Sequence, residues 1–158
     1  MSGLYYEEFK VGQVIPHAVR RTVTETDNLL FCSMTLNTQP LHLDAEFSAK
    51  TIWGQRLVNS LFTLSLILGM AVNDTTLGTT LGNLGMTDIK FPNPVFHGDT
   101  IHAQTEIVDK RESKSRPTAG IVFFLDQGYN QRDELVCECR RAGLMMKRDS
   151  ALSVGGTA

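Results

Sequence analysis

This 158-residue sequence lacks any apolar run long enough to cross a membrane. Its most hydrophobic stretch, residues 57–72, falls short of the roughly 20 apolar residues that a membrane-spanning helix needs, and polar side chains interrupt it. A large net charge is also missing, because 15 basic and 17 acidic residues leave a balance of −2. We therefore expect neither a membrane nor a nucleic acid among the partners.

Cysteine is scarce, and the three that occur do not form a metal-binding pattern. Cys137 and Cys139 are spaced to lie on one face of a strand, unlike the CxxC pairs of metal sites. We interpret Cys32 as a small buried apolar residue. No secretory signal is visible at the N-terminus, so we expect a reducing, cytoplasmic location. No Cys or carboxylate stands at ligand spacing to the histidines, so we expect no bound metal.

Internal repeats and interdomain linkers are absent too, which indicates a single domain. We predict that this domain covers residues 1–148 and that the small, polar residues 149–158 form a flexible tail. Within the domain, the apolar residues of Val58–Val72 lie on nearly all sides of a helix. That pattern is typical of a core helix enclosed by protein on most sides.

The remaining pattern predicts one short helix and several strands. Thr24 followed by Asp27 resembles an N-cap and an acidic first turn, and so predicts a brief helix through Phe31. Alternating or continuous apolar residues predict strands at Val19–Val23, Met86–Phe91, Ile101–Ile107, Gly120–Tyr129 and Leu135–Met146. Strands segregated from one long helix imply an α+β fold, with an antiparallel sheet wrapped around a central helix.

Residues 36–44 form the most informative segment, because they combine a proline with a histidine. Pro40 presets its own backbone and favours an extended Gln39, so we predict a shaped, non-helical loop. His42 follows two residues later, and histidine is the side chain best suited to exchange a proton near neutral pH. The segment predicts acid–base chemistry if His42 faces a pocket.

These residues resemble the signature of the MaoC-like (R)-specific enoyl-CoA hydratases, which have a hot-dog fold. The signature, Asp-x-Asn-Pro-(Leu/Ile/Val)-His ahead of a helix-opening His-Gly, corresponds here to Asn37-Thr38-Gln39-Pro40-Leu41-His42 and Asn59-Ser60. A later turn, Phe91-Pro92-Asn93-Pro94-Val95-Phe96-His97-Gly98-Asp99, is similar to the family's Phe-x-x-Pro-Val-x-x-Gly-Asp. The resemblance runs from about Tyr6 to Lys147.

The resemblance implies a lyase that hydrates and dehydrates a 2-enoyl-CoA thioester. In that family an aspartate and the histidine activate water, and the backbone N–H of the glycine binds the thioester oxygen. This chain has Asn37 for the aspartate, Gln39 for the asparagine and Ser60 for the glycine. We expect His42 to act as the base, with Asn37 orienting water or substrate; the alternative is that Asn37 and Gln39 only stabilise the loop.

Ser60 and its neighbours complete the predicted site. The Ser60 N–H is expected at the first turn of the core helix, where it can bind an oxyanion, while Asn59 or Ser60 can also cap that helix. A serine side chain near the thioester predicts a narrow choice of acyl group. Gln39, Asn59 and Arg56 are assigned as substrate-binding; Arg56 would suit a dicarboxylic acyl-CoA such as a mesaconyl or methylmalyl type, although a surface role is also open.

Two other functions stay open on the same scaffold. One is an acyl-CoA thioesterase, which is disfavoured because Val58–Thr63 contains no Asp or Glu. The other is a non-catalytic thioester-binding subunit, which the missing aspartate makes credible. His17, His97 and His102 rank below His42 as catalytic candidates. We expect no cofactor beyond the coenzyme A of the substrate, and at least a homodimer, because a single hot-dog sheet leaves an edge strand and a face uncovered.

Overall fold

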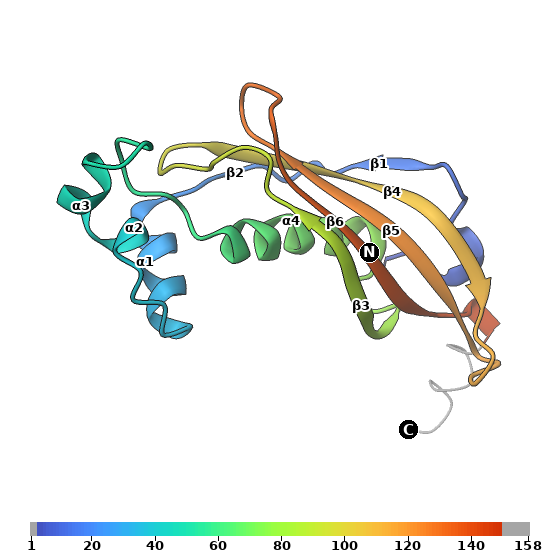
Figure 1. Ribbon diagram of the computed structural model, residues 1–158. Coiled ribbons are helices and arrows are strands. Elements are labelled where there is room, and N and C mark those ends of the chain that lie inside the picture. The colour runs from blue at the N-terminus through green and yellow to red at the C-terminus, as the bar shows by residue number, and fades with distance from the viewer. Residues whose placement is uncertain (1–2, 150–158) are drawn as a thin grey trace.

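A curved antiparallel sheet wraps around one long helix in the computed structural model of this protein, which describes residues 3–149 (Figure 1). The strand order is β1-β4-β5-β6-β3, with β2 paired to β4. The strands are β1 (Val14–Pro16), β2 (Arg21–Thr22), β3 (Thr80–Lys90), β4 (Thr100–Glu112), β5 (Ala119–Tyr129) and β6 (Leu135–Met146). The helices are η1 (Tyr6–Glu8), α1 (Glu25–Met34), α2 (Pro40–Leu43), α3 (Ala45–Ala49) and α4 (Ser60–Thr75). The expected α+β architecture is confirmed.

The alternation in β4 follows the pattern in the sequence. Ile101, Ala103 and Ile107 are buried against the core, whereas His102 and Gln104 lie half-buried on the outer face. This is the arrangement of a strand with one face on a core and the other towards solvent. The strand predictions for β4, β5 and β6 are therefore confirmed.

One side of α4 packs into the concave face of the sheet. Ile67 and Met70 are buried there, and a Cβ on Gly128 of β5 would lie only 2.4 Å from a methyl carbon of Ile67. The opposite side of α4 is open in the single chain, with Leu61 56% exposed. The prediction of a helix enclosed on most sides was therefore wrong for the isolated chain, because the sheet covers only one side of it.

The segment between α1 and α4 is more helical than expected. Gln39 is extended and Pro40 follows it as predicted, but Pro40 opens the one-turn helix α2, since the fixed backbone of proline suits a first helical position. Asp44 then caps α3 through a hydrogen bond from the Phe47 N–H (2.9 Å). The prediction of a non-helical loop over residues 36–44 was therefore wrong for residues 40–43.

Other boundaries moved as well. The predicted strand at Val19–Val23 is reduced to Arg21–Thr22, whereas β3 begins at Thr80 and is longer than predicted. The helix predicted after Thr24 is confirmed with its capping box and extends to Met34. The predicted tail, apart from its first residue, lies outside the described residues.

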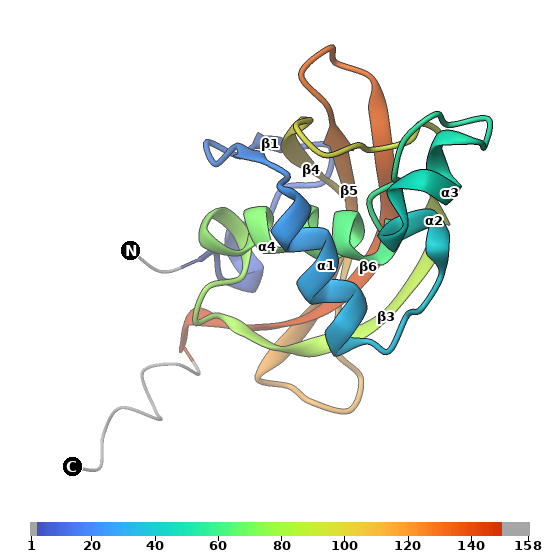
Figure 2. The same ribbon diagram turned by 90° about the vertical axis from the view of Figure 1, so that its left-hand side faces the viewer.

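Helices α1, α2 and α3 gather at one end of the molecule, beyond the first turn of α4 (Figure 1). Viewed along the helix axis, α1 crosses in front of α4, and α2 and α3 lie to its side (Figure 2). This end of the fold therefore brings the segment around His42 close to the beginning of the central helix.

Candidate active site

A cavity of about 250 Å³ lies at the first turn of α4. His42 and Ser60 both line it, so the structure brings together the two residues that the sequence placed at the centre of the chemistry. The other lining residues are mostly apolar: Leu41, Trp53, Leu57, Val58, Thr63, Phe91, Pro92, Asn93, Pro94, Val95 and Val136. An apolar cavity with few polar groups is the usual form of a small-molecule site.

Backbone hydrogen bonds hold the walls of this cavity against each other. The Leu57 N–H donates to the carbonyl of Leu41 (3.1 Å), which joins α2 to the strand-like entry of α4. The Val58 N–H donates to the carbonyl of Val95 (2.9 Å), which joins the same entry to the segment between β3 and β4. Three segments that are far apart in the sequence thus share one rigid rim.

The ring of His42 is oriented by the backbone. Its Nδ1 lies 2.9 Å from the carbonyl oxygen of Leu57. A carbonyl oxygen can only accept, so Nδ1 carries the proton. In the neutral ring Nε2 therefore keeps its lone pair, and no hydrogen-bond partner among the described residues engages it. A histidine held in this tautomer beside a cavity is suited to take a proton from a bound molecule.

The first turn of α4 supplies an unpaired donor to the same cavity. Asn59 caps the helix by accepting a hydrogen bond from the Leu61 N–H (3.0 Å). Within residues 3–149, no acceptor reaches the N–H of Ser60, the first residue of the helix. Free N–H groups and the helix dipole both favour negative charge at this position. The site therefore combines a base with a potential oxyanion donor.

The other sequence-assigned residues do not line the cavity. Asn37 is half-buried, and its Oδ1 accepts a hydrogen bond from the Gln39 N–H (3.0 Å), while the Gln39 side chain is exposed. Asn59 is 4% exposed and engaged in capping. Arg56 forms an ion pair with Glu25 (2.7 Å).

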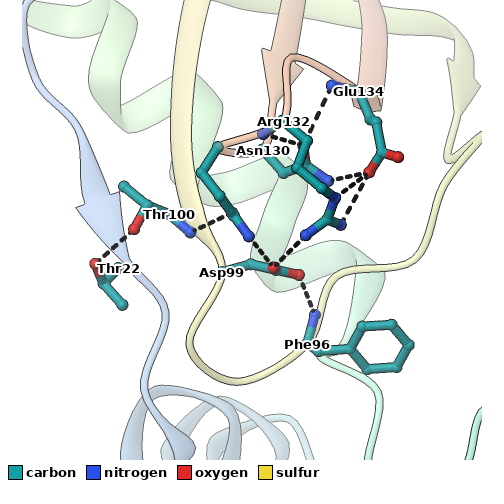
Figure 3. Close-up of polar contacts among 8 residues, drawn as sticks. Thr22, Phe96, Asp99, Thr100, Asn130, Arg132 and Glu134 are labelled. Atoms are coloured by element: carbon teal, nitrogen blue, oxygen red, sulfur yellow. Dashed lines mark hydrogen bonds and ion pairs between the residues drawn. The ribbon is translucent and has the colours of Figure 1, made fainter.

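A carboxylate outside the cavity shapes the turn that precedes β4. Asp99 is 6% exposed; it accepts from the Phe96 N–H (2.8 Å) and from Nε2 of Gln131 (2.7 Å), and Arg132 of the β5–β6 hairpin lies 3.6 Å away. Figure 3 shows Phe96 and Arg132 converging on this carboxylate from two elements. Gly98 provides the positive φ of +95° that the turn needs. Asp99 thereby fixes the segment that forms one cavity wall.

Sequence reasoning missed Asn28 of α1 and its contact with His97. Asn28 is fully buried, and its side chain contacts the carbonyl oxygens of His42 and Leu57 and the Nε2 of His97. Burial lowers the pKa of His97, and the positive charge of Arg56 lowers it further. The sequence offers one signal for Asn28: it is a polar residue four positions before Cys32, on the side of α1 that is buried.

A second histidine, His17, forms a triad-like arrangement in which both ring nitrogens have protein partners. His17 Nδ1 lies 2.9 Å from Asp74, its Nε2 lies 2.8 Å from the Thr105 hydroxyl, and Thr105 donates to Asp126 (2.6 Å). Thr105 is 0% exposed, so its hydroxyl cannot meet a thioester as a nucleophile. This cluster is built as an internal support.

Two negative findings concern residues 3–149 only. No helix in that part of the chain is both long and apolar enough to cross a membrane. No group of three or more His, Cys, Asp or Glu side chains there could hold a metal ion.

The sequence matches the family model described as MaoC like domain over residues 8–122. Beta-methylmalyl-CoA dehydratase from Chloroflexus aurantiacus is 32% identical, over 93% of this chain and 41% of that protein. Mesaconyl-CoA hydratase from Cereibacter sphaeroides is 30% identical, over 95% of this chain and 43% of that protein. The chain thus spans about two-fifths of the length of these curated relatives.

Solved structures with a similar fold include the following two. A monoamine oxidase regulatory protein from Archaeoglobus fulgidus has a TM-score of 0.83 at 35% identity, covering 93% of this chain and 97% of that one. A Mycobacterium tuberculosis protein described as a double hotdog fold has a TM-score of 0.83 at 22% identity, covering 92% of this chain and 44% of that one. The expected hot-dog fold is confirmed.

Proposed function

Because this chain belongs to the MaoC-like domain family, we propose that it is a lyase that reversibly hydrates a 2-enoyl-CoA thioester to a 3-hydroxyacyl-CoA. The observation that carries the proposal is that a histidine with a free Nε2 and a helix-opening residue with a free N–H line one apolar cavity. The names of the relatives, a methylmalyl-CoA dehydratase and a mesaconyl-CoA hydratase, support the same reaction class.

In the proposed reaction, Nε2 of His42 takes a proton from water while the water oxygen attacks the β carbon of the enoyl group. The electron pair of the C=C bond moves towards the thioester, and the Ser60 N–H stabilises the enolate oxygen that forms. One such donor is typically worth about 10²–10³-fold in rate. The α carbon then receives a proton from the imidazolium, which returns His42 to its neutral form; dehydration runs these steps in reverse.

Asn37 takes no part in the proton transfer in this scheme. Its Oδ1 is bonded to the Gln39 N–H, which supports a role in shaping the loop that carries His42. The carbonyl of Leu57 orients the His42 ring through Nδ1, so the orientation of the base does not depend on residue 37.

A short acyl group fits this site best. The cavity volume of about 250 Å³ is below the range of roughly 300–1,000 Å³ usual for ligand sites. His42 is the only ionisable side chain among the lining residues, and Arg56 is paired with Glu25. A branched or dicarboxylic acyl group therefore rests on the names of the relatives, and a second subunit would have to supply any cation for its free carboxylate.

The experiment that tests the reaction is a panel of short, branched and dicarboxylic enoyl-CoA esters. Loss of the enoyl absorbance without release of free thiol is expected for at least one short member. Release of free thiol would instead identify a thioesterase, and binding without either change would identify a passive thioester-binding subunit. Full activity in the presence of a metal chelator is expected, since we propose no cofactor beyond the coenzyme A of the substrate.

We propose a homodimer assembled through β3 and the open side of α4. Strand β3 is an edge of the sheet and exposes Leu84 (54%) and Ile89 (40%), and a long apolar edge strand is a strong site for pairing. A molar mass near twice 17.5 kDa by light scattering is expected. A strictly monomeric protein at micromolar concentration would contradict it.

The free, buried state of all three cysteines supports a reducing, cytoplasmic location.

A further inference from the structure

Asn28 is the most fully engaged polar side chain near the cavity, although it does not line it. It lies on α1 and is 0% exposed. A buried amide without partners is costly, so its contacts identify what it is there to hold. Those contacts join the segment that carries His42 to the first turn of α4.

The nitrogen of the Asn28 amide faces three acceptors with two hydrogens, so two of the acceptors share one hydrogen. Nδ2 lies 3.0 Å from the carbonyl oxygen of Leu57, 3.2 Å from the carbonyl oxygen of His42 and 3.1 Å from Nε2 of His97. The amide oxygen faces donors instead: Oδ1 accepts from the Asn59 N–H (2.9 Å) and lies 3.9 Å from the thiol of Cys32. Exchanging the two amide atoms would put oxygen against two carbonyls, so the orientation is unambiguous.

This orientation determines the tautomer of His97. The amide nitrogen can only donate, so Nε2 of His97 must present its lone pair, and the proton of the neutral ring is on Nδ1. The lowered pKa of His97, which burial and Arg56 cause, agrees with a ring that stays neutral.

The same side chain controls the partner of His42. The Leu57 carbonyl accepts both from Asn28 Nδ2 and from Nδ1 of His42. Asn28 also holds the N–H of Asn59, the residue immediately before Ser60. One amide therefore fixes the acceptor that orients the base and the backbone that enters the helix whose first N–H is the proposed oxyanion donor.

We propose that Asn28 is a positioning residue that holds His42 and His97 as Nδ1–H tautomers and aligns the base with the first turn of α4. Its effect on turnover rests on the proposed hydratase function, whereas its effect on the two rings does not. Asn28 touches no reacting atom in this arrangement; it acts through Leu57, His97 and Asn59.

The test is the tautomeric state of the histidine rings, read from long-range ¹H–¹⁵N spectra of uniformly ¹⁵N-labelled protein at pH 7.5. Single His→Gln variants assign the signals. Wild-type His42 and His97 are both expected to show a protonated Nδ1 and an unprotonated Nε2. Either ring found as the Nε2–H tautomer in the wild type would overturn the proposal without any variant.

Asn28→Asp is the sharpest variant because it keeps the size of the side chain and the bond to Asn59. A carboxylate oxygen in place of Nδ2 cannot donate, so His97 can bond to it only after gaining a proton on Nε2. We expect the His97 signal to change to an Nε2–H or doubly protonated ring. The Leu57 carbonyl loses one donor and gains a repelling neighbour, so the His42 signals are expected to move or broaden.

Asn28→Ser, which keeps a single donor in a smaller volume, serves as the second variant if Asn28→Asp does not fold. It is expected to give mixed His42 tautomers. Asn73→Ala, which removes an exposed amide from α4, is the control and should leave both rings unchanged. Folded Asn28 variants with unaltered ring signals would show that the amide only fills space, and would overturn the proposal.

Turnover supplies the second readout. With any enoyl-CoA that the wild type hydrates, the Asn28 variants should lose roughly 10–100-fold in kcat, by analogy with the removal of orienting partners from metal-bound histidines, with KM changed less than about threefold. If the rings respond as expected but the wild type hydrates no enoyl-CoA, Asn28 keeps its role and the hydratase function fails. If turnover exists and neither kcat nor the rings respond, the hydratase stands and the role of Asn28 fails.

Discussion

The two ends of α4 each hold a histidine inside the protein, and their hydrogen bonds suit them to opposite purposes. At the first turn, His42 uses Nδ1 to bind a carbonyl and leaves Nε2 beside a cavity. Near the last turn, His17 uses both nitrogens, one with Asp74 and one with Thr105. Burial separates them only in degree, since His17 is buried and His42 is half-buried. A histidine is available for chemistry when one ring nitrogen has no protein partner and faces space that a molecule can enter.

The largest expected effect on turnover comes from replacing His42, the histidine with a free ring nitrogen. His42→Ala should lower kcat/KM for a cognate enoyl-CoA by about 10²–10⁴-fold, because it deletes the general base. The measurement is the initial rate of enoyl absorbance loss, with His17→Ala as the matched control. Hydration at the wild-type rate in His42→Ala would mean that the two histidines do not differ in the way proposed.

Replacing His17, whose ring nitrogens both have protein partners, should lower the stability of the fold instead. His17→Ala removes a buried ring together with its hydrogen bond to Thr105, and the loss of a buried hydrogen bond costs about 0.5–1.5 kcal/mol before any cavity is counted. For a domain of this size each kcal/mol corresponds to roughly 2–4 °C in Tm. Thermal unfolding should show this loss while kcat stays within about twofold of wild type. A large fall in kcat at unchanged Tm would give His17 a chemical role.

The pH dependence of stability offers a finer distinction. Burial first, and then the charge of Arg56, lower the pKa of His97 below its value of about 6.5 in an unfolded chain. The unfolded state therefore binds the proton more tightly, and the contribution of His97 to stability is complete above pH 6.5 and declines as the pH falls through the folded pKa. Urea unfolding at pH 7.5 and pH 5.5 should show a smaller loss on acidification in His97→Gln than in wild type. An equal loss in both proteins would contradict this.

The smallest effect is expected at residue 37, where the resemblance to the family signature predicts an aspartate. Asn37→Asp introduces a carboxylate, but an aspartate oxygen can keep the bond to the Gln39 N–H that Asn37 makes. We expect kcat to change less than about threefold, well below the usual range for an acid–base group. A gain of tenfold or more, with a new limb in the pH profile, would show that residue 37 reaches the reacting water.

The regular part of the fold could be predicted because its signals are local. The alternation of Ile101, Ala103 and Ile107 places one face of β4 on the core, and a continuous apolar run identifies α4. The helix α2 was missed because proline at a first helical position looks the same in sequence as proline in a loop. The exposed side of α4 was missed because an apolar sequence shows only that its residues favour burial. It does not show whether the same chain covers them, and no described part of this chain covers that side of α4.

The candidate site also has one part that the sequence predicted and one part that tertiary packing decided. Residues 37–42, read together with Asn59-Ser60, nominated His42 and Ser60 because they resemble the family signature, and because the proton chemistry of an imidazole depends on residue type. The remainder depended on packing. Asn28 meets Leu57 and His97 only after α1 crosses the entry of α4, and Asp99 meets Arg132 only when the β5–β6 hairpin folds back. Which nitrogen of which histidine is free is decided by those contacts, since hydrogen bonds between residues distant in sequence form only in the folded chain.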